Sequence, residues 1–196
     1  MIIHLPNILT VMRMLLVPVF IYLLFWGGDH RYLLALVIFI TAGVTDIVDG
    51  YLARKLKIES TFGKLLDPLA DKLLVLSALV SFVTMGLIYA WMVALIVLRD
   101  VVVTTIRFLL ERSATPMATS NVAKGKTAVQ IAIVILILSY LSMQSYQVEW
   151  VTDLIDRSKI IPVAMVITML FTVYTGFDYL VVNRAGLRAL ARPNSE

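Results

Sequence analysis

Four aspartates with regular spacing are the residues of this chain best suited to chemistry. They are Asp46, Asp49, Asp67 and Asp71. On a helix, positions three or four apart share one face, so each pair would present its two carboxylates on the same side. Two unit charges about 4 Å apart repel by about 4 kcal/mol at an effective dielectric constant near 20, so clustered carboxylates need cations to stay ionised. The aspartates therefore predict a site for divalent cations, of the kind that activates phosphoryl groups.

The composition of the chain narrows this chemistry further. Among 196 residues there is no cysteine and only two histidines, His4 and His30. Thiolate nucleophiles, zinc cages and serine–histidine triads are therefore excluded or nearly so. Oxygen ligands alone favour Mg²⁺, Mn²⁺ or Ca²⁺. The chain is also 60% hydrophobic and only 15% charged, whereas soluble domains are about 45–50% apolar and about 25% charged. Disorder and a typical soluble enzyme are excluded.

The elements that must position the aspartates are membrane-spanning helices, because a span needs about 20 mostly apolar residues. The mean hydropathy of +0.92 agrees with this interpretation. The sequence predicts an all-α polytopic fold in which residues 1–196 form a single membrane domain with six spans. The spans are Ile8–Trp26, Tyr32–Ala53, Asp67–Met85, Ile88–Leu110, Thr127–Val148 and Ile160–Val182. In the first of them, Arg13 is expected to extend its long side chain to the interface.

Charge placement decides how the central apolar run is divided. Residues 73–98 carry no charge, and basic segments lie on either side of them, at residues 54–64 and 107–126. Basic segments prefer the cytoplasmic side, so the chain must turn back near Gly86 to place both there. Both termini are then cytoplasmic, and the C-terminal tail adds Arg184, Arg188 and Arg192 on this side. The connections on the opposite side are Gly27–Arg31, Gly86–Leu87 and Glu149–Lys159, all expected to be loops.

The start of the third span fixes where the acids meet. Asp67 followed by Pro68 predicts a helix N-cap with proline at the first helical position. A short connection would then bring the four aspartates into one polar pocket in the cytoplasmic half of the membrane, where ionisable groups are costly and usually functional. The alternative is that Asp67 is merely a cap and Asp46 pairs with a nearby base such as Arg54. That alternative accounts for one or two of the acids and not for all four.

Residues 46–71 read Asp-x2-Asp-Gly-x2-Ala-Arg-x8-Gly-x3-Asp-x3-Asp. This pattern resembles the signature of the CDP-alcohol phosphatidyltransferase family at every fixed position. The resemblance implies that the four aspartates hold two divalent cations, Mg²⁺ or Mn²⁺, across the pyrophosphate of a CDP-linked lipid. It also implies that Asp71 takes the proton from an acceptor hydroxyl and that CMP leaves. The residues implied to contact the CDP-lipid within this segment are Gly50, Ala53, Arg54, Ser60 and Gly63.

Two further motifs bear on the choice of substrates. Leu5-Pro-Asn7-x2-Thr10-x2-Arg13 and Lys124-Gly-Lys126-Thr127 resemble the branch of the family whose donor is CDP-diacylglycerol and whose acceptor is sn-glycerol 3-phosphate. Asn7 and Thr10 are implied to hold the cytidine end of the donor. The residues expected to bind the acceptor phosphate are Arg107, which is expected to lie deep in the fourth span, together with Lys124, Lys126 and Arg184. One alternative is that the two lysines are ordinary basic residues flanking a span. A separate alternative is that the acceptor is phosphatidylglycerol, inositol phosphate or serine.

The expected setting is the cytoplasmic membrane of a bacterium, with the active site facing the cytoplasm. The expected partners are membrane lipids and a second copy of the chain in a homodimer, with no nucleic acid. A divalent-cation transporter is the rival from another class, since intramembrane carboxylates also mark ion pathways. A transporter would place its ligands near the midplane and in both halves of a repeat, whereas the acids here gather at one side. Asp100 is interpreted as merely a partner for Arg99, and Asp178 is left unexplained.

Overall fold

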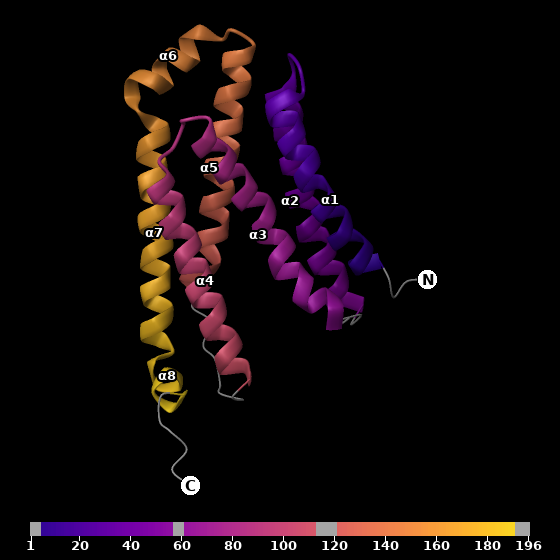
Figure 1. Cartoon of the computed structure of the whole chain (residues 1–196), viewed down its shortest axis with the longest axis vertical. Helices are drawn as coiled ribbons and strands as arrows, with labels where there is room; N and C mark the ends of the chain where they lie inside the picture. The colour runs from indigo at the N-terminus through magenta and orange to yellow at the C-terminus, as the bar shows by residue number, and fades with distance from the viewer. Residues whose placement is uncertain (1–4, 57–60, 113–120, 191–196) are drawn as a thin grey trace. The chain divides into compact units, whose positions relative to one another are not determined.

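The computed structural model describes the backbone of residues 5–56, 61–112 and 121–190, and the side chains of residues 12–45, 72–110 and 125–188. Within these ranges the chain is helical and contains no strand (Figure 1). In chain order the helices are α1 (Leu5–Trp26), α2 (Arg31–Leu56), α3 (Thr61–Thr84), α4 (Ala90–Arg112), α5 (Asn121–Ser145), α6 (Glu149–Ser158), α7 (Ile160–Val182) and α8 (Arg184–Leu190). The predicted all-α class is therefore confirmed.

The chain divides into two compact units. The first comprises Met1–Leu87 and Val134–Ile161, and the second comprises Ile88–Ile133 and Pro162–Glu196. In the first unit α1 packs against both α2 and α3. Phe20 of α1 and Phe39 of α2 are buried there, with ring centroids 6.1 Å apart. In the second unit α4 contacts α8. The motif of four aspartates belongs entirely to the first unit.

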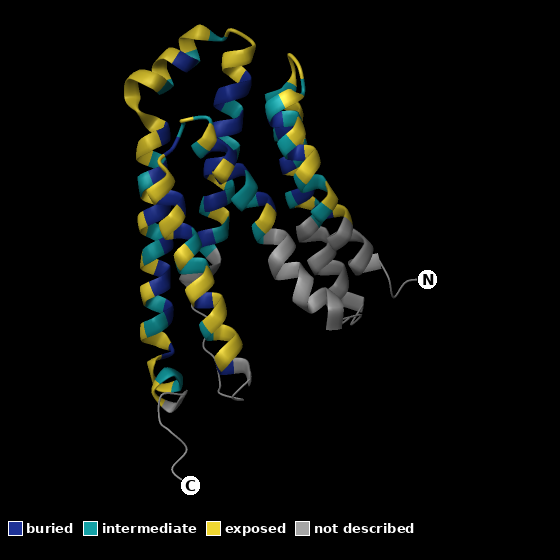
Figure 2. Ribbon diagram, viewed as in Figure 1, coloured by how far each residue is buried: buried dark blue, intermediate teal, exposed yellow. Residues whose placement is uncertain are grey.

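Two helices of the described chain are long and apolar enough to cross a membrane. They are Gly125–Ser145, within α5, and Ile160–Val182, which is α7. Shorter apolar stretches occupy Met12–Trp26, Arg31–Thr45 and Lys72–Thr84. Large apolar side chains are exposed along these helices (Figure 2), as is expected where lipid rather than water is the solvent. These features support an all-α membrane protein, and the full set of six spans stays a prediction.

The predicted division of the central apolar run is confirmed. Helix α3 ends at Thr84 and α4 begins at Ala90. Between them Gly86 has φ of 75°, a left-handed conformation that glycine adopts without the steric cost of a side chain. The predicted span at Ile160–Val182 also has the same bounds as α7.

The predicted start of the third helix is wrong. Helix α3 begins at Thr61, so Asp67 is not an N-cap, and Pro68 lies inside the helix. Proline lacks a backbone N–H, so one carbonyl loses its usual donor without the helix having to end there. Phe62, Leu65 and Leu66 continue the apolar spacing before the Asp-Pro pair. This longer pattern outweighs the local capping signal.

Three further expectations are corrected by the structure. Glu149–Lys159 is not a loop, because residues 149–158 form α6, where Thr152 is buried and the hydroxyl of Tyr140 donates to Asp156 Oδ1 at 2.8 Å. The segment after the last predicted span is not a plain tail, because it forms α8. Arg13 is only 5% exposed and so does not extend outward. Asp156 of α6 is held by Tyr140 of α5, and Arg13 is covered where α2 and α3 pack against α1. Both contacts join different helices, so the local sequence does not indicate them.

Candidate functional site

The four aspartates lie near one connection, between α2 and α3. Asp46 and Asp49 are in α2, which ends at Leu56. Asp67 and Asp71 are in α3. At 3.6 residues per turn, all four positions fall within about three turns of the helix ends that flank residues 57–60. Because α1 packs against both helices, the two helices that carry the motif share one neighbour.

The helical backbone agrees with the spacing on which the metal site was predicted. In α2, positions 46, 49, 50 and 53 share one face, and in α3 positions 63, 67 and 71 do so. The side chains of the four aspartates lie outside the described part of the chain. Their chemistry still fits hard divalent cations, because the motif offers carboxylate oxygens and contains neither histidine nor cysteine. Among side chains that the structure describes, no group of three or more histidines, cysteines or acids gathers to bind a metal.

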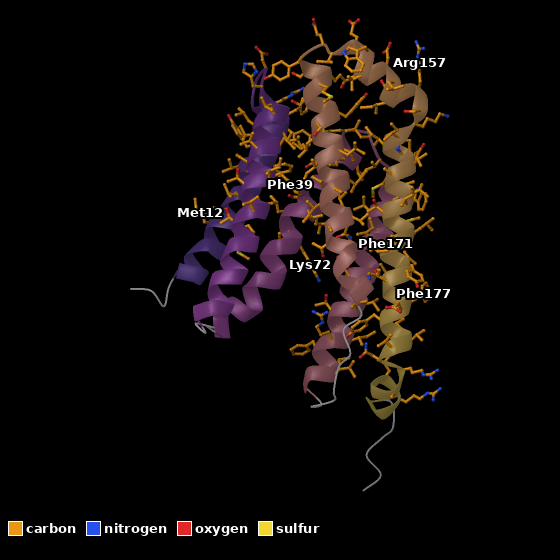
Figure 3. All side chains as sticks on the ribbon, turned by 180° about the vertical axis from the view of Figure 1, so that it is seen from behind. Met12, Phe39, Lys72, Arg157, Phe171 and Phe177 are labelled. Carbon is orange, nitrogen blue, oxygen red and sulfur yellow. The ribbon has the colours of Figure 1, made fainter. Side chains whose placement is uncertain are left out.

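The other residues expected to contact the CDP-lipid are distributed over the same three helices. Asn7 and Thr10 are on α1, and the remaining four within helices are Gly50, Ala53, Arg54 and Gly63, on α2 and α3. Their side chains are not described, and Ser60 lies outside the described residues altogether. Lys72, which follows Asp71, is half-buried on α3 (Figure 3). The helices thus bring these positions into one compact unit.

The residues expected to bind the acceptor phosphate belong to the second unit. Arg107 is exposed and lies near the end of α4 rather than deep within it. Arg184, on α8, is also exposed. Because α4 contacts α8, the helices that carry these two arginines are neighbours. Lys124 is on α5, and its side chain lies outside the described part.

Lys126 differs from the other basic residues because it is buried, with 7% of its surface exposed. Its ammonium contacts Asp100 Oδ1, and Arg99 Nη1 contacts the same oxygen at 3.0 Å. A Cβ added at the preceding residue, Gly125, would lie 3.5 Å from the ring of Phe171 on α7. A lysine that merely flanks a span would extend to the surface, so this alternative does not describe Lys126.

We call Arg99, Asp100 and Lys126 the charged cluster. The expected pairing of Asp100 with Arg99 is confirmed, and Lys126 is a second partner that the sequence did not reveal. Asp100 and Lys126 are on different helices, 26 residues apart in the chain. No spacing rule connects positions on two helices, so only the packing of α4 against α5 could identify this pair. For Asp178, Oδ2 is buried and has no hydrogen-bond partner within the described side chains.

Helix α7 holds Arg99 in place. Arg99 Nη2 donates to Thr175 Oγ1 at 3.1 Å, and that hydroxyl donates to the carbonyl of Thr172 at 2.7 Å. Beside it, Gly176 leaves room for the arginine stem, since a Cβ at this position would lie 2.7 Å from Arg99 Cγ. The charged cluster, which lies on α4 and α5, is therefore also connected to α7, and all of these residues belong to the second unit.

Replacing Gly176 with alanine should destabilise the protein. The added methyl would force the stem of Arg99 away from Thr175, and overpacking of this kind typically costs about 1–3 kcal/mol. Alanine regains at most about 1 kcal/mol of helix propensity, so a net loss is expected. The measurement is the thermal unfolding midpoint in detergent. An unchanged or higher unfolding midpoint would contradict the prediction, because it would show that displacing the Arg99 stem costs no stability.

Comparison with known proteins places these observations in context. The model of the CDP-alcohol phosphatidyltransferase family matches residues 3–174. A CDP-diacylglycerol–glycerol-3-phosphate 3-phosphatidyltransferase of Bacillus subtilis is 36% identical over 197 residues, covering 94% of this chain and 97% of that protein. A probable phosphatidylglycerophosphate synthase of Mycobacterium tuberculosis is 36% identical, covering 90% and 80% of the two chains. A CDP-diacylglycerol–glycerol-3-phosphate 3-phosphatidyltransferase of Rickettsia bellii is 31% identical, covering 90% and 93%.

Proposed function

The chain belongs to the CDP-alcohol phosphatidyltransferase family, and we propose that it transfers the phosphatidyl group of CDP-diacylglycerol to a hydroxyl of sn-glycerol 3-phosphate. The products are CMP and phosphatidylglycerophosphate. The observation that carries this proposal is the similarity to the Bacillus subtilis protein, which extends over 94% of this chain. That relative is named for these two substrates, and the relatives from Mycobacterium tuberculosis and Rickettsia bellii carry names of the same meaning.

The aspartate motif provides the reacting centre of the proposed enzyme. Asp46, Asp49, Asp67 and Asp71 would hold two divalent cations, Mg²⁺ or Mn²⁺, which supply positive charge against the donor pyrophosphate. Asp71 would also accept the proton of the acceptor hydroxyl. The oxygen so released forms a bond to the lipid-linked phosphorus. The bond from that phosphorus to the CMP oxygen breaks, and CMP leaves with the electron pair.

The remaining residues of the motif would bind the donor. Gly50 and Ala53 have little or no side chain and leave space on the face of α2 that carries two aspartates. Arg54 supplies a guanidinium whose planar fork suits phosphate oxygens. The residues proposed to complete the donor site are Asn7 and Thr10 at the cytidine, with Ser60 and Gly63 beside the nucleotide. Support comes from the helical placement of the motif and from its agreement with the family pattern.

Four basic residues would bind the phosphate of the acceptor. They are Arg107, Lys124, Lys126 and Arg184. The exposure of both arginines leaves them available to a ligand, and the names of the relatives indicate an acceptor that carries a phosphate. Guanidinium and ammonium groups are the usual partners of phosphate in proteins.

Replacing Arg107 with alanine should raise the KM for sn-glycerol 3-phosphate and leave the KM for CDP-diacylglycerol unchanged. Charge-assisted hydrogen bonds typically contribute about 1.5–3 kcal/mol, which corresponds to roughly ten- to hundredfold in KM. Steady-state CMP release with each substrate varied in turn is the measurement. If both constants stay as in the unmodified protein, the acceptor phosphate binds elsewhere.

The setting of the enzyme is likewise part of the proposal. Residues 1–196 would form one membrane domain with six spans and both termini in the cytoplasm, in the cytoplasmic membrane of a bacterium. The active site would face the cytoplasm, and two copies would associate as a homodimer. The family match across residues 3–174 includes parts of both compact units, which supports one functional domain. The basic segments at residues 54–64 and 107–126 support the orientation.

The deciding experiment uses purified protein in detergent with CDP-diacylglycerol and Mg²⁺ or Mn²⁺. Each reaction receives one acceptor: sn-glycerol 3-phosphate, phosphatidylglycerol, inositol phosphate or serine. We expect CMP and phosphatidylglycerophosphate with sn-glycerol 3-phosphate. Product from another acceptor alone would move the chain to a different branch of the family. No metal-dependent CMP release with any acceptor would reject the enzyme assignment, and metal uptake into proteoliposomes would then favour a transporter.

A further inference from the structure

We propose that Asp100 is a positioning residue, which holds the ammonium of Lys126 in place for the phosphate of the acceptor. The proposal rests on the proposed function, since it presumes that Lys126 binds that phosphate. It assigns to Asp100 a part in acceptor binding without contact between Asp100 and the substrate.

The first argument is the burial of Lys126. An ammonium that leaves water loses several kcal/mol of hydration unless an opposite charge compensates for it. Lys126 is buried, and its ammonium contacts Asp100 Oδ1. A lysine stem has four rotatable carbon bonds and is flexible when exposed. The contact with Asp100 therefore selects one inward orientation of this side chain from many.

The second argument is that the carboxylate has a partner that is itself anchored. Arg99 Nη1 lies 3.0 Å from the same oxygen, and its other nitrogen, Nη2, donates to Thr175 on α7. Because Arg99 also compensates the charge of Asp100, the Lys126 ammonium can share its hydrogens between Asp100 and a bound phosphate. The Asp100 carboxylate then keeps an opposite charge beside it, which a lone lysine–aspartate pair would not provide.

The third argument is that every residue involved belongs to the second compact unit. The charged cluster joins α4, α5 and α7, and a second polar contact runs parallel to it, because Gln130 Nε2 donates to Thr172 Oγ1 at 3.5 Å. Gln130 lies one turn after Lys126 on α5 and is also buried. The neutral pair joins α5 to α7 one turn away from Lys126, so it offers a control for the packing of this region.

The test compares Asp100→Asn with the unmodified protein by steady-state kinetics. We expect the KM for sn-glycerol 3-phosphate to rise by about ten- to hundredfold, the range that corresponds to the loss of one charge-assisted hydrogen bond. The kcat and the KM for CDP-diacylglycerol should change little. Asp100→Glu, which keeps the charge and lengthens the side chain, should restore part of the affinity.

A double-mutant cycle shows whether Asp100 acts through Lys126. Lys126→Met alone should raise the same KM, and Asp100→Asn added to it should raise that KM no further. Gln130→Met removes the neutral contact one turn away and should leave the KM unchanged. Thermal unfolding midpoints of all variants show whether each is folded. If Asp100→Asn does not fold, Asp100→Glu with and without Lys126→Met gives the same cycle.

The outcomes separate this proposal from the one on which it rests. If Lys126→Met raises the KM and Asp100→Asn does not, Asp100 has no positioning part and the acceptor site stands. A rise in Gln130→Met equal to that in Asp100→Asn would show a general effect of packing and overturn the proposal. If Lys126→Met itself leaves the KM unchanged, Lys126 does not bind the acceptor. A protein that makes no product from sn-glycerol 3-phosphate instead rejects the proposed function.

Discussion

Replacing Asp71 with asparagine is expected to abolish product formation while CDP-diacylglycerol still binds. The amide of asparagine is nearly isosteric with the carboxylate but cannot accept the proton of the acceptor hydroxyl. Loss of a general base typically lowers the rate by about 10²–10⁴-fold, and loss of a metal-binding oxygen adds to this. The measurements are the rate of CMP release and the equilibrium binding of CDP-diacylglycerol to the variant.

The control for this variant is Asp153→Asn, which neutralises an exposed acid on α6 outside the motif. It should retain both activity and binding. Turnover of Asp71→Asn at a rate comparable to the unmodified protein would contradict the assignment of Asp71 as the base. Loss of donor binding together with loss of turnover would instead assign Asp71 to the metal site alone.

Replacing Asp49 with asparagine is expected to produce the second largest effect, on the metal requirement. Removing one carboxylate charge about 4 Å from a cation weakens their attraction by a few kcal/mol at an effective dielectric constant near 20. The concentration of Mg²⁺ or Mn²⁺ at half-maximal activity should therefore rise by at least about tenfold. Titrating each metal while following CMP release measures this shift.

The two aspartate variants should respond differently to excess metal. High Mg²⁺ or Mn²⁺ should restore part of the activity of Asp49→Asn, because the remaining three carboxylates still offer oxygen ligands. It should not restore Asp71→Asn, because the missing base is not replaced by a cation. A chelator should stop the unmodified enzyme reversibly. An unchanged metal requirement in Asp49→Asn would remove Asp49 from the metal site.

The elements that local sequence could predict are those governed by local rules. The long apolar run at Ile160–Val182 forms a helix with the expected bounds. A membrane span must be a helix of about 20 apolar residues, so the length of the run predicts the length of the helix. The turn near Gly86 followed from charge on both sides of an uncharged run, and the structure confirms it. The spacing of the aspartates likewise agrees with the helical backbone of α2 and α3.

The errors arose where two local signals competed or where a distant contact decided. The Asp67-Pro68 pair looks the same at the first turn of a helix and in its interior, and only the pattern from Thr61 onward shows that the helix had already begun. The segment at residues 149–158 becomes a helix whose Asp156 receives a hydrogen bond from Tyr140 on α5. With both corrections made, the four aspartates still lie on α2 and α3, as predicted.

The sequence by itself determined which ligand chemistry this protein can offer. Four aspartates at fixed spacing, without cysteine or nearby histidine, provide carboxylate oxygens, which are the ligands that hard cations prefer, whatever the surrounding fold. Only the tertiary structure decided which of the basic residues expected to bind the acceptor are exposed and which are buried in ion pairs. Arg107 is exposed, whereas Lys126 is buried against Asp100. The reason is physical, because ligand chemistry is a property of residue type, while burial and pairing depend on which helices pack together.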